Sequence, residues 1–492
     1  MGITIVDLPA EVLHEVFSSF RSDFITDVSP GKFGWRFGVG NGGPADPASI
    51  KSARLACRRL NEAASPFLLP CVTVGVDQRS LDLVGSIVRN PPIASGVHAV
   101  KVELSCYPLD ACADLPGFMG LQMSDIQNSE NYLHYGNYAM DDDHMNAVIQ
   151  GRISSILESW NNDTDIGGTS ADSTTASESP NYRAILLDAY AEFRARSSEQ
   201  TCLLDTGSFA RSLGSLIPRL PRFGALYFND DLDTLRDGHD PLKTFFEPEL
   251  LMGFLTSPYN VHGAECRNPP EILQFATASL LRDLPVAIHE ARGTIRALSI
   301  SCFPEIPRNI SFVDLVGQED RLRDAFRDLE NVNIYSVSRT RHHDDGTLDP
   351  DGAGGTENRY LAAAVSAPSL SKIDFHWRFQ WRLELYQARS RLYTASTVLA
   401  AFTSERITQL FLRNVSVSES ELVDVLRRLS SPTRVYLNEI MLTRGSWGPV
   451  VEELKKKTAA RYAEGRCDVR VHECGGVLYP FGPKAYPPEE LA

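Results

Sequence analysis

Two short runs in this 492-residue chain carry side chains that could bind a metal ion. Residues 342–345 read His-His-Asp-Asp, and residues 141–144 read Asp-Asp-Asp-His. A protein metal site needs three or four convergent ligands that are themselves held by hydrogen bonds. Neither run has the spacing of a known metal motif, so we expect solvated loops and assign no metal ligand.

The sequence has no motif of nucleophilic or phosphoryl-transfer catalysis. Gly-x-Ser-x-Gly, His-Glu-x-x-His and the Walker loop are all absent. The nine cysteines are scattered without a Cys-x-x-Cys pair, and no local pattern pairs one of them with a histidine. We therefore expect a protein that is not an enzyme and has no cofactor, with reduced thiols in the cytoplasm or the nucleus.

One aromatic and basic strand is a candidate for recognition. Residues 376–382 read His-Trp-Arg-Phe-Gln-Trp-Arg, so aromatic and polar side chains alternate between the two faces of a strand. Aromatic residues and arginine are enriched at binding hot spots. We expect the aromatic face to be buried and the polar face to contact an acidic substrate. The substrate-binding residues that we expect are Arg339, Arg341, His376, Arg378 and Arg382.

Composition excludes two classes of partner. The net charge of −15 makes a general phosphate-binding surface improbable, so we expect no nucleic-acid partner. No apolar run approaches the roughly 20 residues that a membrane helix needs, so we expect no membrane partner. The 43% apolar and 23% charged content is typical of a folded protein with a core.

The first 72 residues carry two amphipathic helical patterns. The first follows the helix-start residues Asp7 and Pro9, and the second begins near Pro47. Two helices of this length cannot bury all their apolar residues against each other, so the surplus must pack on the rest of the chain or on a partner. The apolar positions are Leu13, Val16, Phe17 and Phe20 in the first pattern, and Ile50, Ala53, Cys57, Leu60 and Ala64 in the second.

Two motifs in these helices carry a family resemblance. Residues 8–13 read Leu-Pro-Ala-Glu-Val-Leu, and residues 54–61 read Arg-Leu-Ala-Cys-Arg-Arg-Leu-Asn. In this order they resemble a fungal-type F-box, the helical module that docks a protein onto the Skp-type adaptor of a cullin–RING ubiquitin ligase. The resemblance implies adaptor, cullin and RING subunits as partners. It assigns adaptor contacts to Leu8, Pro9, Val12, Val16, Phe17, Leu55, Cys57, Arg58 and Phe67.

The chain departs from the F-box pattern at one point. An F-box normally joins its helices by a short turn, whereas a glycine-rich insertion occupies residues 22–49 here. The cost of closing a loop grows slowly with its length, so such an insertion is tolerable.

A strand-like spacing of apolar residues recurs through the rest of the chain, with helical patterns in between. It resembles the strand signature of leucine-rich repeats without the regular asparagine. The fold class that we expect is therefore α/β: an N-terminal helical F-box, then an irregular leucine-rich-repeat-like solenoid of helix–strand repeats with a parallel sheet and loop insertions. A non-repeating α/β domain is the alternative. The strand pairs are Val100/Val102, Leu226/Phe228, Leu298/Ile300, Val332/Ile334, Ile373/Phe375, Leu410/Leu412, Val435/Leu437 and Val469/Val471.

These patterns divide the chain into an F-box-like module at 1–72, a repeat domain at 73–476 and a tail at 477–492. Residues 161–180 are polar and acidic without an aromatic residue, which predicts disorder. Long connections follow strands, and in a solenoid they project from one rim, where we expect the substrate to bind. The connections are 106–142, 338–358 and 376–393.

The resemblance implies the substrate-recognition subunit of an SCF (Skp–cullin–F-box) ubiquitin ligase. A second interpretation is a binding scaffold outside any ligase, in which the N-terminal helices cap the open end of the repeat array. A third is an enzyme, which would need a pocket with convergent titratable groups. The sequence does not name the protein substrate.

Overall fold

The structure is a computed structural model, and the chain divides into two compact units. The sheet unit comprises Met1–Glu103, Gly207–Asn229 and Ser279–Ala492, and the helical unit comprises Leu104–Thr206 and Asp230–Ala278. Three segments of the sequence analysis lie outside the described residues. They are residues 22–46 of the expected insertion, the segment 162–180 and the tail 477–492. The structure describes residues 8–18, 47–135, 143–161, 181–229, 241–260, 271–301, 318–338, 354–379, 393–430, 432–463, 467–472 and 475–476.

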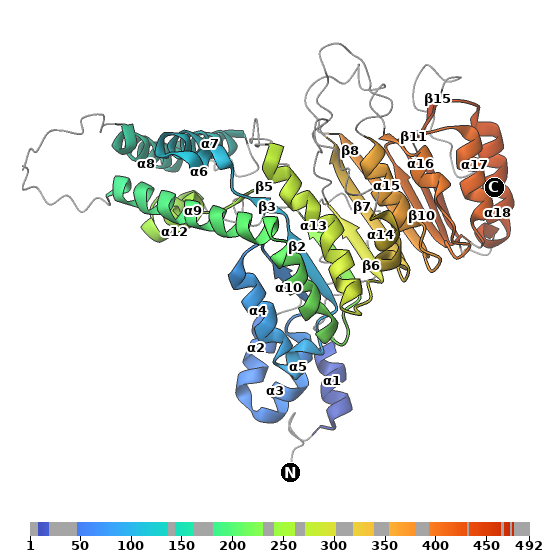
Figure 1. Cartoon of the computed structure of the whole chain (residues 1–492), viewed down its shortest axis with the longest axis horizontal. Coiled ribbons are helices and arrows are strands. Elements are labelled where there is room, and N and C mark those ends of the chain that lie inside the picture. The colour runs from blue at the N-terminus through green and yellow to red at the C-terminus, as the bar shows by residue number, and fades with distance from the viewer. Residues whose placement is uncertain are drawn as a thin grey trace, which may run out of the picture. The chain divides into compact units, whose positions relative to one another are not determined.

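A parallel sheet of nine strands forms the centre of the sheet unit, and its strands follow one another in chain order without a reversal (Figure 1). Every neighbouring pair is parallel. The strands are β1 (Cys71–Val74), β2 (Ala99–Glu103), β4 (Ala225–Asn229), β6 (Ala297–Ile300), β7 (Asn331–Ser338), β8 (Lys372–Phe379), β10 (Gln409–Arg413), β12 (Arg434–Asn438) and β14 (Asp468–His472).

Two apolar rows run across all nine strands and are buried. Each strand contributes two residues that are two positions apart, so both point to the same face. All eight predicted strand pairs lie in these rows, and β1 adds a ninth pair that the sequence analysis did not assign. The first row is Val72, Val100, Leu226, Leu298, Val332, Ile373, Leu410, Val435 and Val469, and the second is Val74, Val102, Phe228, Ile300, Ile334, Phe375, Leu412, Leu437 and Val471.

The same backbone hydrogen bonds recur where each strand begins. The carbonyl two residues before the first apolar-row position accepts two successive N–H groups from the next strand's start; for example, the Ser371 carbonyl accepts from Thr408 and Gln409. This arrangement satisfies the backbone at one edge of the sheet in the same way from β1 to β12. The accepting residues are Pro70, His98, Gly224, Arg296, Glu330, Ser371 and Thr408.

Helices connect successive strands. Crossovers between parallel neighbours are almost always right-handed, so an unreversed strand order places the connecting helices on one face of the sheet. Successive helices from α14 to α18 pack on one another along the sheet (Figure 1). The helices of this unit after residue 70 are α4 (Gln78–Val88), α5 (Pro91–Ala94), α10 (Ser208–Leu216), α13 (Glu271–Glu290, from Ser279 onward), α14 (Glu319–Phe326), α15 (Gly354–Val365), α16 (Ser396–Ala400), α17 (Glu419–Arg428) and α18 (Trp447–Ala463), with a 3-10 turn at η3 (Ile217–Arg219).

Polar side chains join the ends of neighbouring helices. Ser404 donates to the carbonyls of Pro368 and Leu370 at 3.1 and 2.7 Å. Lys457 donates in the same manner to two carbonyls at the end of α17, at 2.6 and 2.9 Å. Lys457 thereby satisfies carbonyls that the end of α17 leaves without an intrahelical donor, whereas Ser404 binds the connection between α15 and β8. Ser418 and Glu421 form a capping box at the start of α17.

A small parallel sheet follows the last strands of the main sheet. It consists of β9 (Tyr393–Thr394), β11 (Val415–Val417), β13 (Met441–Leu442) and β15 (Gly475–Gly476). Asn414 and Glu439 turn the chain from one sheet to the other, and both have a positive φ, of 56° and 54°. They follow Arg413 and Asn438, which pair in register, so the same left-handed turn occurs in two successive strands.

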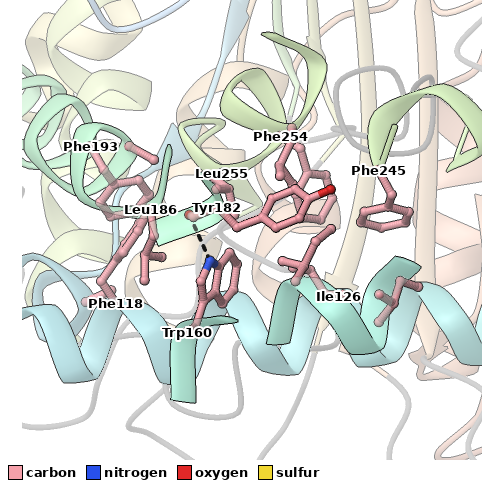
Figure 2. Packing of buried hydrophobic residues seen from close by; sticks show 14 of the residues in the cluster. Phe118, Ile126, Trp160, Tyr182, Leu186, Phe193, Phe245, Phe254 and Leu255 are labelled. Carbon is pink, nitrogen blue, oxygen red and sulfur yellow. Dashed lines mark hydrogen bonds between the residues drawn. The ribbon is translucent and has the colours of Figure 1, made fainter. Parts of the chain in front are cut away.

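The helical unit has its own aromatic core (Figure 2). Phe193 is fully buried, with ring centroids of Tyr107 and Phe118 at 4.9 and 5.1 Å. Trp160 donates from Nε1 to the Tyr182 carbonyl at 3.1 Å. The elements are β3 (Ser105–Cys106), α6 (Leu109–Ala113), α7 (Leu115–Tyr135), α8 (Asp143–Asn161), α9 (Tyr182–Asp205), α11 (Pro241–Thr244), α12 (Pro248–Leu255) and β5 (Tyr259–Asn260).

The helical unit corrects one expectation of the sequence analysis. The connection at 106–142 was expected to be a loop, but its described part forms α6 and α7. Both chain segments of the unit follow strands that pair with each other, since Glu103 at the end of β2 pairs with Asn229 at the end of β4. The fold is therefore α/β with a large parallel sheet, as expected, and it includes a second compact unit made of helices.

Candidate binding surfaces

The N-terminal module has a small core of its own. It contains α1 (Ala10–Ser18), α2 (Pro47–Ala56), α3 (Arg58–Ala64) and the 3-10 turn η2 (Ser65–Phe67). The Phe67 ring lies 4.8 Å from the His14 ring and 6.5 Å from the Phe17 ring, centroid to centroid. Arg59 donates to the Leu8 carbonyl at 2.7 Å, which fastens the start of α1 to α3. The buried residues are Leu13, Phe17, Ile50, Leu60, Ala64 and Phe67.

A break at Cys57 divides the expected second helix into α2 and α3. Cys57 has extended backbone with φ −162° and ψ 164°, which interrupts the helix. Arg54 spans the break by donating from Nε to Asn61 Oδ1 at 3.1 Å and to Ser65 Oγ at 2.9 Å. The break removes Cys57 from the predicted apolar stripe, and Leu55 beside it is 88% exposed.

The structure separates the predicted adaptor contacts into two groups. Phe17 and Phe67 are buried in the module's core and are not available as surface contacts in this conformation. The other seven are exposed or half-buried, and Val12 is 42% exposed. A large apolar side chain such as Leu55 at the surface is typical of an interaction site when other apolar groups accompany it. The seven are Leu8, Pro9, Val12, Val16, Leu55, Cys57 and Arg58.

The backbone of the module lies directly against the backbone at the start of the sheet, where Pro66 meets Gly96. Any Cβ added at Gly96 would lie 1.7 Å from the Pro66 carbonyl oxygen, so only glycine fits there. The Pro70 carbonyl accepts hydrogen bonds from His98 and Ala99 at 2.9 and 3.2 Å. The module is therefore held directly beside β1, the edge strand of the main sheet.

The outward face of the main sheet is the second candidate surface. Residues that alternate with the buried apolar rows point away from the helices. From β8 to β12 these outward positions carry charged and aromatic side chains. They are Lys372, Asp374 and His376 on β8, Gln409, Phe411 and Arg413 on β10, and Arg434, Tyr436 and Asn438 on β12.

Cation–aromatic contacts order this face. Lys372 Nζ lies 5.8 Å from the centroid of the Phe411 ring, and the Arg413 guanidinium lies 4.9 Å from the centroid of the Tyr436 ring. The Phe411 and Tyr436 rings are 6.4 Å apart. Such contacts attract a cationic group to the face of an aromatic ring.

Asp374 is a buried carboxyl at the centre of the face. It is 1% exposed, and neither of its oxygens has a hydrogen-bond partner among the described residues. Burial raises the pKa of Asp374 from 3.8 to about 6, although the positive charges of Arg413 and Lys372 oppose the rise. Asn333 pairs with Asp374 in register, and its Oδ1 also lacks a described partner.

The predicted substrate residues fall mostly outside the described side chains. His376 is buried on the outward face of β8, and it pairs in register with Arg413. Arg378 lies in β8 by its backbone, where it pairs with Val337, and the description of side chains ends at His376. Arg339, Arg341 and Arg382 lie outside the described residues.

The sequence analysis missed Lys372, Asp374 and Arg413. A signal for them was present, because they flank the apolar pairs already recognised in β8 and β10. Aligning those pairs would have placed Asp374 beside Phe411, and Arg413 two residues farther along the same face.

The described residues do not form a metal site, and one half-buried thiol is unreactive. No three His, Cys, Asp or Glu side chains among them are placed to hold a metal ion. Residues 342–345 and the side chains at 141–144 lie outside the description. Burial raises the pKa of Cys71 to about 12, so this thiol stays protonated and is a poor nucleophile. None of the described helices has the length and apolar character to cross a membrane.

Comparison with known proteins does not extend these findings. No protein-family model matches the sequence, and no curated protein matches it.

Proposed function

We propose that this chain is the substrate-recognition subunit of an SCF-type ubiquitin ligase in the cytoplasm or the nucleus. The N-terminal module would bind the Skp-type adaptor as an F-box, and through it the cullin and RING subunits. The remaining sheet unit would be an irregular leucine-rich-repeat-like solenoid that binds a protein substrate. Its role is to hold the substrate near the arriving ubiquitin, which raises the effective concentration of the reacting groups.

The observation that carries the proposal is the exposure of Leu55. This residue belongs to the Leu-x-Cys-Arg motif that resembles an F-box, and 88% of it faces solvent while the module buries a core elsewhere. An apolar side chain in this position has no role in folding the module, whereas a groove on a partner would bury it. The exposure of Val12, in the other F-box-like motif, supports the same interpretation.

The repeated geometry of the sheet unit supports the solenoid. Strand order follows chain order across nine strands, and the double hydrogen bond at each strand start recurs from Pro70 to Thr408. A doubly wound α/β domain would reverse its strand order at a switch point. Such arrays present one extended face for binding, which here is the outward face of the sheet.

A second function is favoured by the contact between Pro66 and Gly96. The module lies against the edge of the sheet unit, as a cap that closes the open end of a repeat array would. In that case the chain is a protein-binding scaffold outside any ligase. The two functions differ in what covers the exposed residues of α1 and α2.

Co-elution with purified Skp-type adaptor on size-exclusion chromatography tests the proposal. The wild-type chain should co-elute with the adaptor, and then with cullin and RING subunits. Val12→Asp should prevent co-elution, because it places a charge in a desolvated apolar contact. Val148→Asp is the matched control, since Val148 is a helical valine with similar exposure, 40% against 42% for Val12. A wild-type chain that elutes alone would support the scaffold instead.

A further inference from the structure

The helical unit carries an arginine that separate segments of the chain hold in place. Arg152 lies on α8, and its Nε donates to the Phe245 carbonyl at 3.2 Å. Its guanidinium carbon lies 4.9 Å from the centroid of the Tyr182 ring at the start of α9, and 5.6 Å from the centroid of the Phe246 ring between α11 and α12. One carbonyl and two aromatic rings therefore position the guanidinium without neutralising its charge.

The outer edge of this guanidinium is available to a ligand. Arg152 is half-buried, and its two Nη groups have no acceptor among the described residues. They are also not among the polar atoms that the described part of the chain shields from solvent. No described carboxylate forms an ion pair with Arg152, although Glu247 follows Phe246 in the chain. The Nη groups thus face solvent as two parallel donors, the arrangement that binds a carboxylate in a bidentate manner.

An exposed aromatic ring lies beside these donors. Phe246 is 38% exposed, whereas its neighbour Phe245 is buried in the aromatic core of the unit (Figure 2). The Tyr182 hydroxyl is shielded from solvent, so the ligand contacts that we assign are the Arg152 Nη groups and the Phe246 ring alone. A cation and an apolar ring are therefore both within reach of one short segment of a ligand.

We propose that Arg152 and Phe246 form a docking site for a protein partner in which an acidic residue stands next to an aromatic one. The partner's carboxylate pairs with both Nη groups, and the neighbouring ring packs on Phe246. Charge complementarity selects this occupant, because Arg152 is a cation without a described acidic partner in a chain whose net charge is −15. Arginine and aromatic side chains are also the residues that carry most of the binding energy in protein interfaces.

The site goes beyond the proposed function, which gives the helical unit no role. The rings of Tyr182 and Phe246 hold the guanidinium before a ligand arrives, so binding orders few additional side chains. The F-box-like module belongs to the sheet unit, and Arg152 belongs to the helical unit. Loss of this site therefore leaves adaptor binding intact, and the reverse also holds.

Ligand-observed fluorine NMR on the full chain tests the inference, because it detects the weak binding expected of a short peptide. The probe is a peptide with blocked ends in which para-fluorophenylalanine precedes glutamate and the other residues are glycine and serine. Its fluorine resonance should broaden when the full chain is added, and less so as salt is raised. The same peptide with glutamine in place of glutamate should bind about threefold more weakly or worse.

Three variants of the chain locate the binding. Arg152→Gln removes the charge and should weaken binding of the glutamate peptide about three- to tenfold. Phe246→Ala, at an exposed position, should weaken it about two- to fivefold. Arg194→Gln is the matched control, because Arg194 is an exposed arginine of the same unit that lies 5.5 Å from the Tyr190 ring and contacts no second ring among the described residues. It should leave the affinity within about twofold.

Several results would overturn the inference. They are absence of binding to the wild type, equal binding of the glutamine peptide, an unchanged affinity in Phe246→Ala or in a folded Arg152→Gln, and an equal loss in Arg194→Gln. Circular dichroism shows whether each variant is folded, and Phe246→Ala alone decides if Arg152→Gln is not. Equal affinity for para-fluorophenylacetate would overturn the assignment to a protein partner, because a small carboxylate would then suffice.

Discussion

Asn333 and Asp374 face each other across strands β7 and β8 with no described hydrogen bond to either Asn333 Oδ1 or the Asp374 carboxyl oxygens. Asn333 Oδ1 and the ionised carboxyl oxygens of Asp374 are all acceptors, so these atoms cannot satisfy one another. Burial without a donor favours the protonated carboxyl and accounts for its pKa of about 6. The ionised Asp374 carboxyl therefore lowers the free energy of unfolding at neutral pH.

Asp374→Asn is expected to stabilise the protein at neutral pH. The pKa of Asp374 is raised on folding, from 3.8 to about 6, so its favourable contribution to the free energy of unfolding is complete below pH 4 and is lost as the pH rises through 6. The variant lacks this loss, and its amide can donate to Asn333. Its advantage should grow between pH 4 and pH 6 and then level off at about 3 kcal/mol at most, since one pKa unit is worth about 1.4 kcal/mol.

Urea denaturation of both proteins at several pH values measures this difference. Lys372 and Arg413, whose charges act on the Asp374 carboxyl, are present in both proteins, so the only change is at residue 374. A difference in unfolding free energy that does not change between pH 4 and pH 7 would contradict the account of Asp374.

Gly96→Ala is expected to disrupt the contact between the N-terminal module and the first strands. Its Cβ would lie 1.7 Å from the Pro66 carbonyl oxygen, and backbone must move to relieve the clash. We expect a loss of about 2 kcal/mol or more in the free energy of unfolding, as for overpacked sites. Gly85→Ala is the control, because no atom lies within 4 Å of its added Cβ in helix α4, and it should stabilise by up to about 1 kcal/mol. Similar effects of the two changes on the denaturation midpoint would count against the close approach.

Phe193→Ala is expected to loosen the helical unit. Phe193 is fully buried among the rings of Tyr107, Phe118 and Tyr259, and truncating such a side chain costs about 3–5 kcal/mol. Hydrogen exchange should speed up across α7 and α9 and stay unchanged in β10. Leu187→Ala on α9 is the control, because 42% of Leu187 is exposed and its loss should change little. Unchanged protection of α9 in Phe193→Ala would refute this assignment of the core.

The sequence predicted the main sheet well because its signal is local. Each strand carries two apolar residues two positions apart, as in Leu410 and Leu412, and all eight predicted pairs lie in strands of the sheet. The capping box of Ser418 and Glu421 is an equally local feature, since it needs only residues three apart. The β1 pair, Val72 and Val74, was overlooked because it follows the module so closely.

The features that depend on distant residues could not be predicted. The helical unit buries Ile126 of α7 with Phe254 of α12, which are far apart in the chain, so the local pattern at 106–142 did not reveal a core. The chain breaks at Cys57 and α3 then contacts α2, whereas a continuous apolar stripe predicted a single helix there. The grouping of Lys372, Asp374 and Arg413 on one face of the sheet depends on the register between β8 and β10, which no local pattern in the sequence specifies.

Isothermal titration of purified Skp-type adaptor into the full chain tests the central claim most directly. The three proteins to compare are the wild type, Leu55→Asp and the control Leu83→Asp, whose leucine is 53% exposed on helix α4 of the same unit. The account predicts binding to the wild type and to Leu83→Asp. It predicts a loss of about a hundredfold or more in Leu55→Asp, with unchanged circular dichroism, because a charge would be buried at the contact. No binding to the wild type, or equal binding to all three proteins, would contradict it.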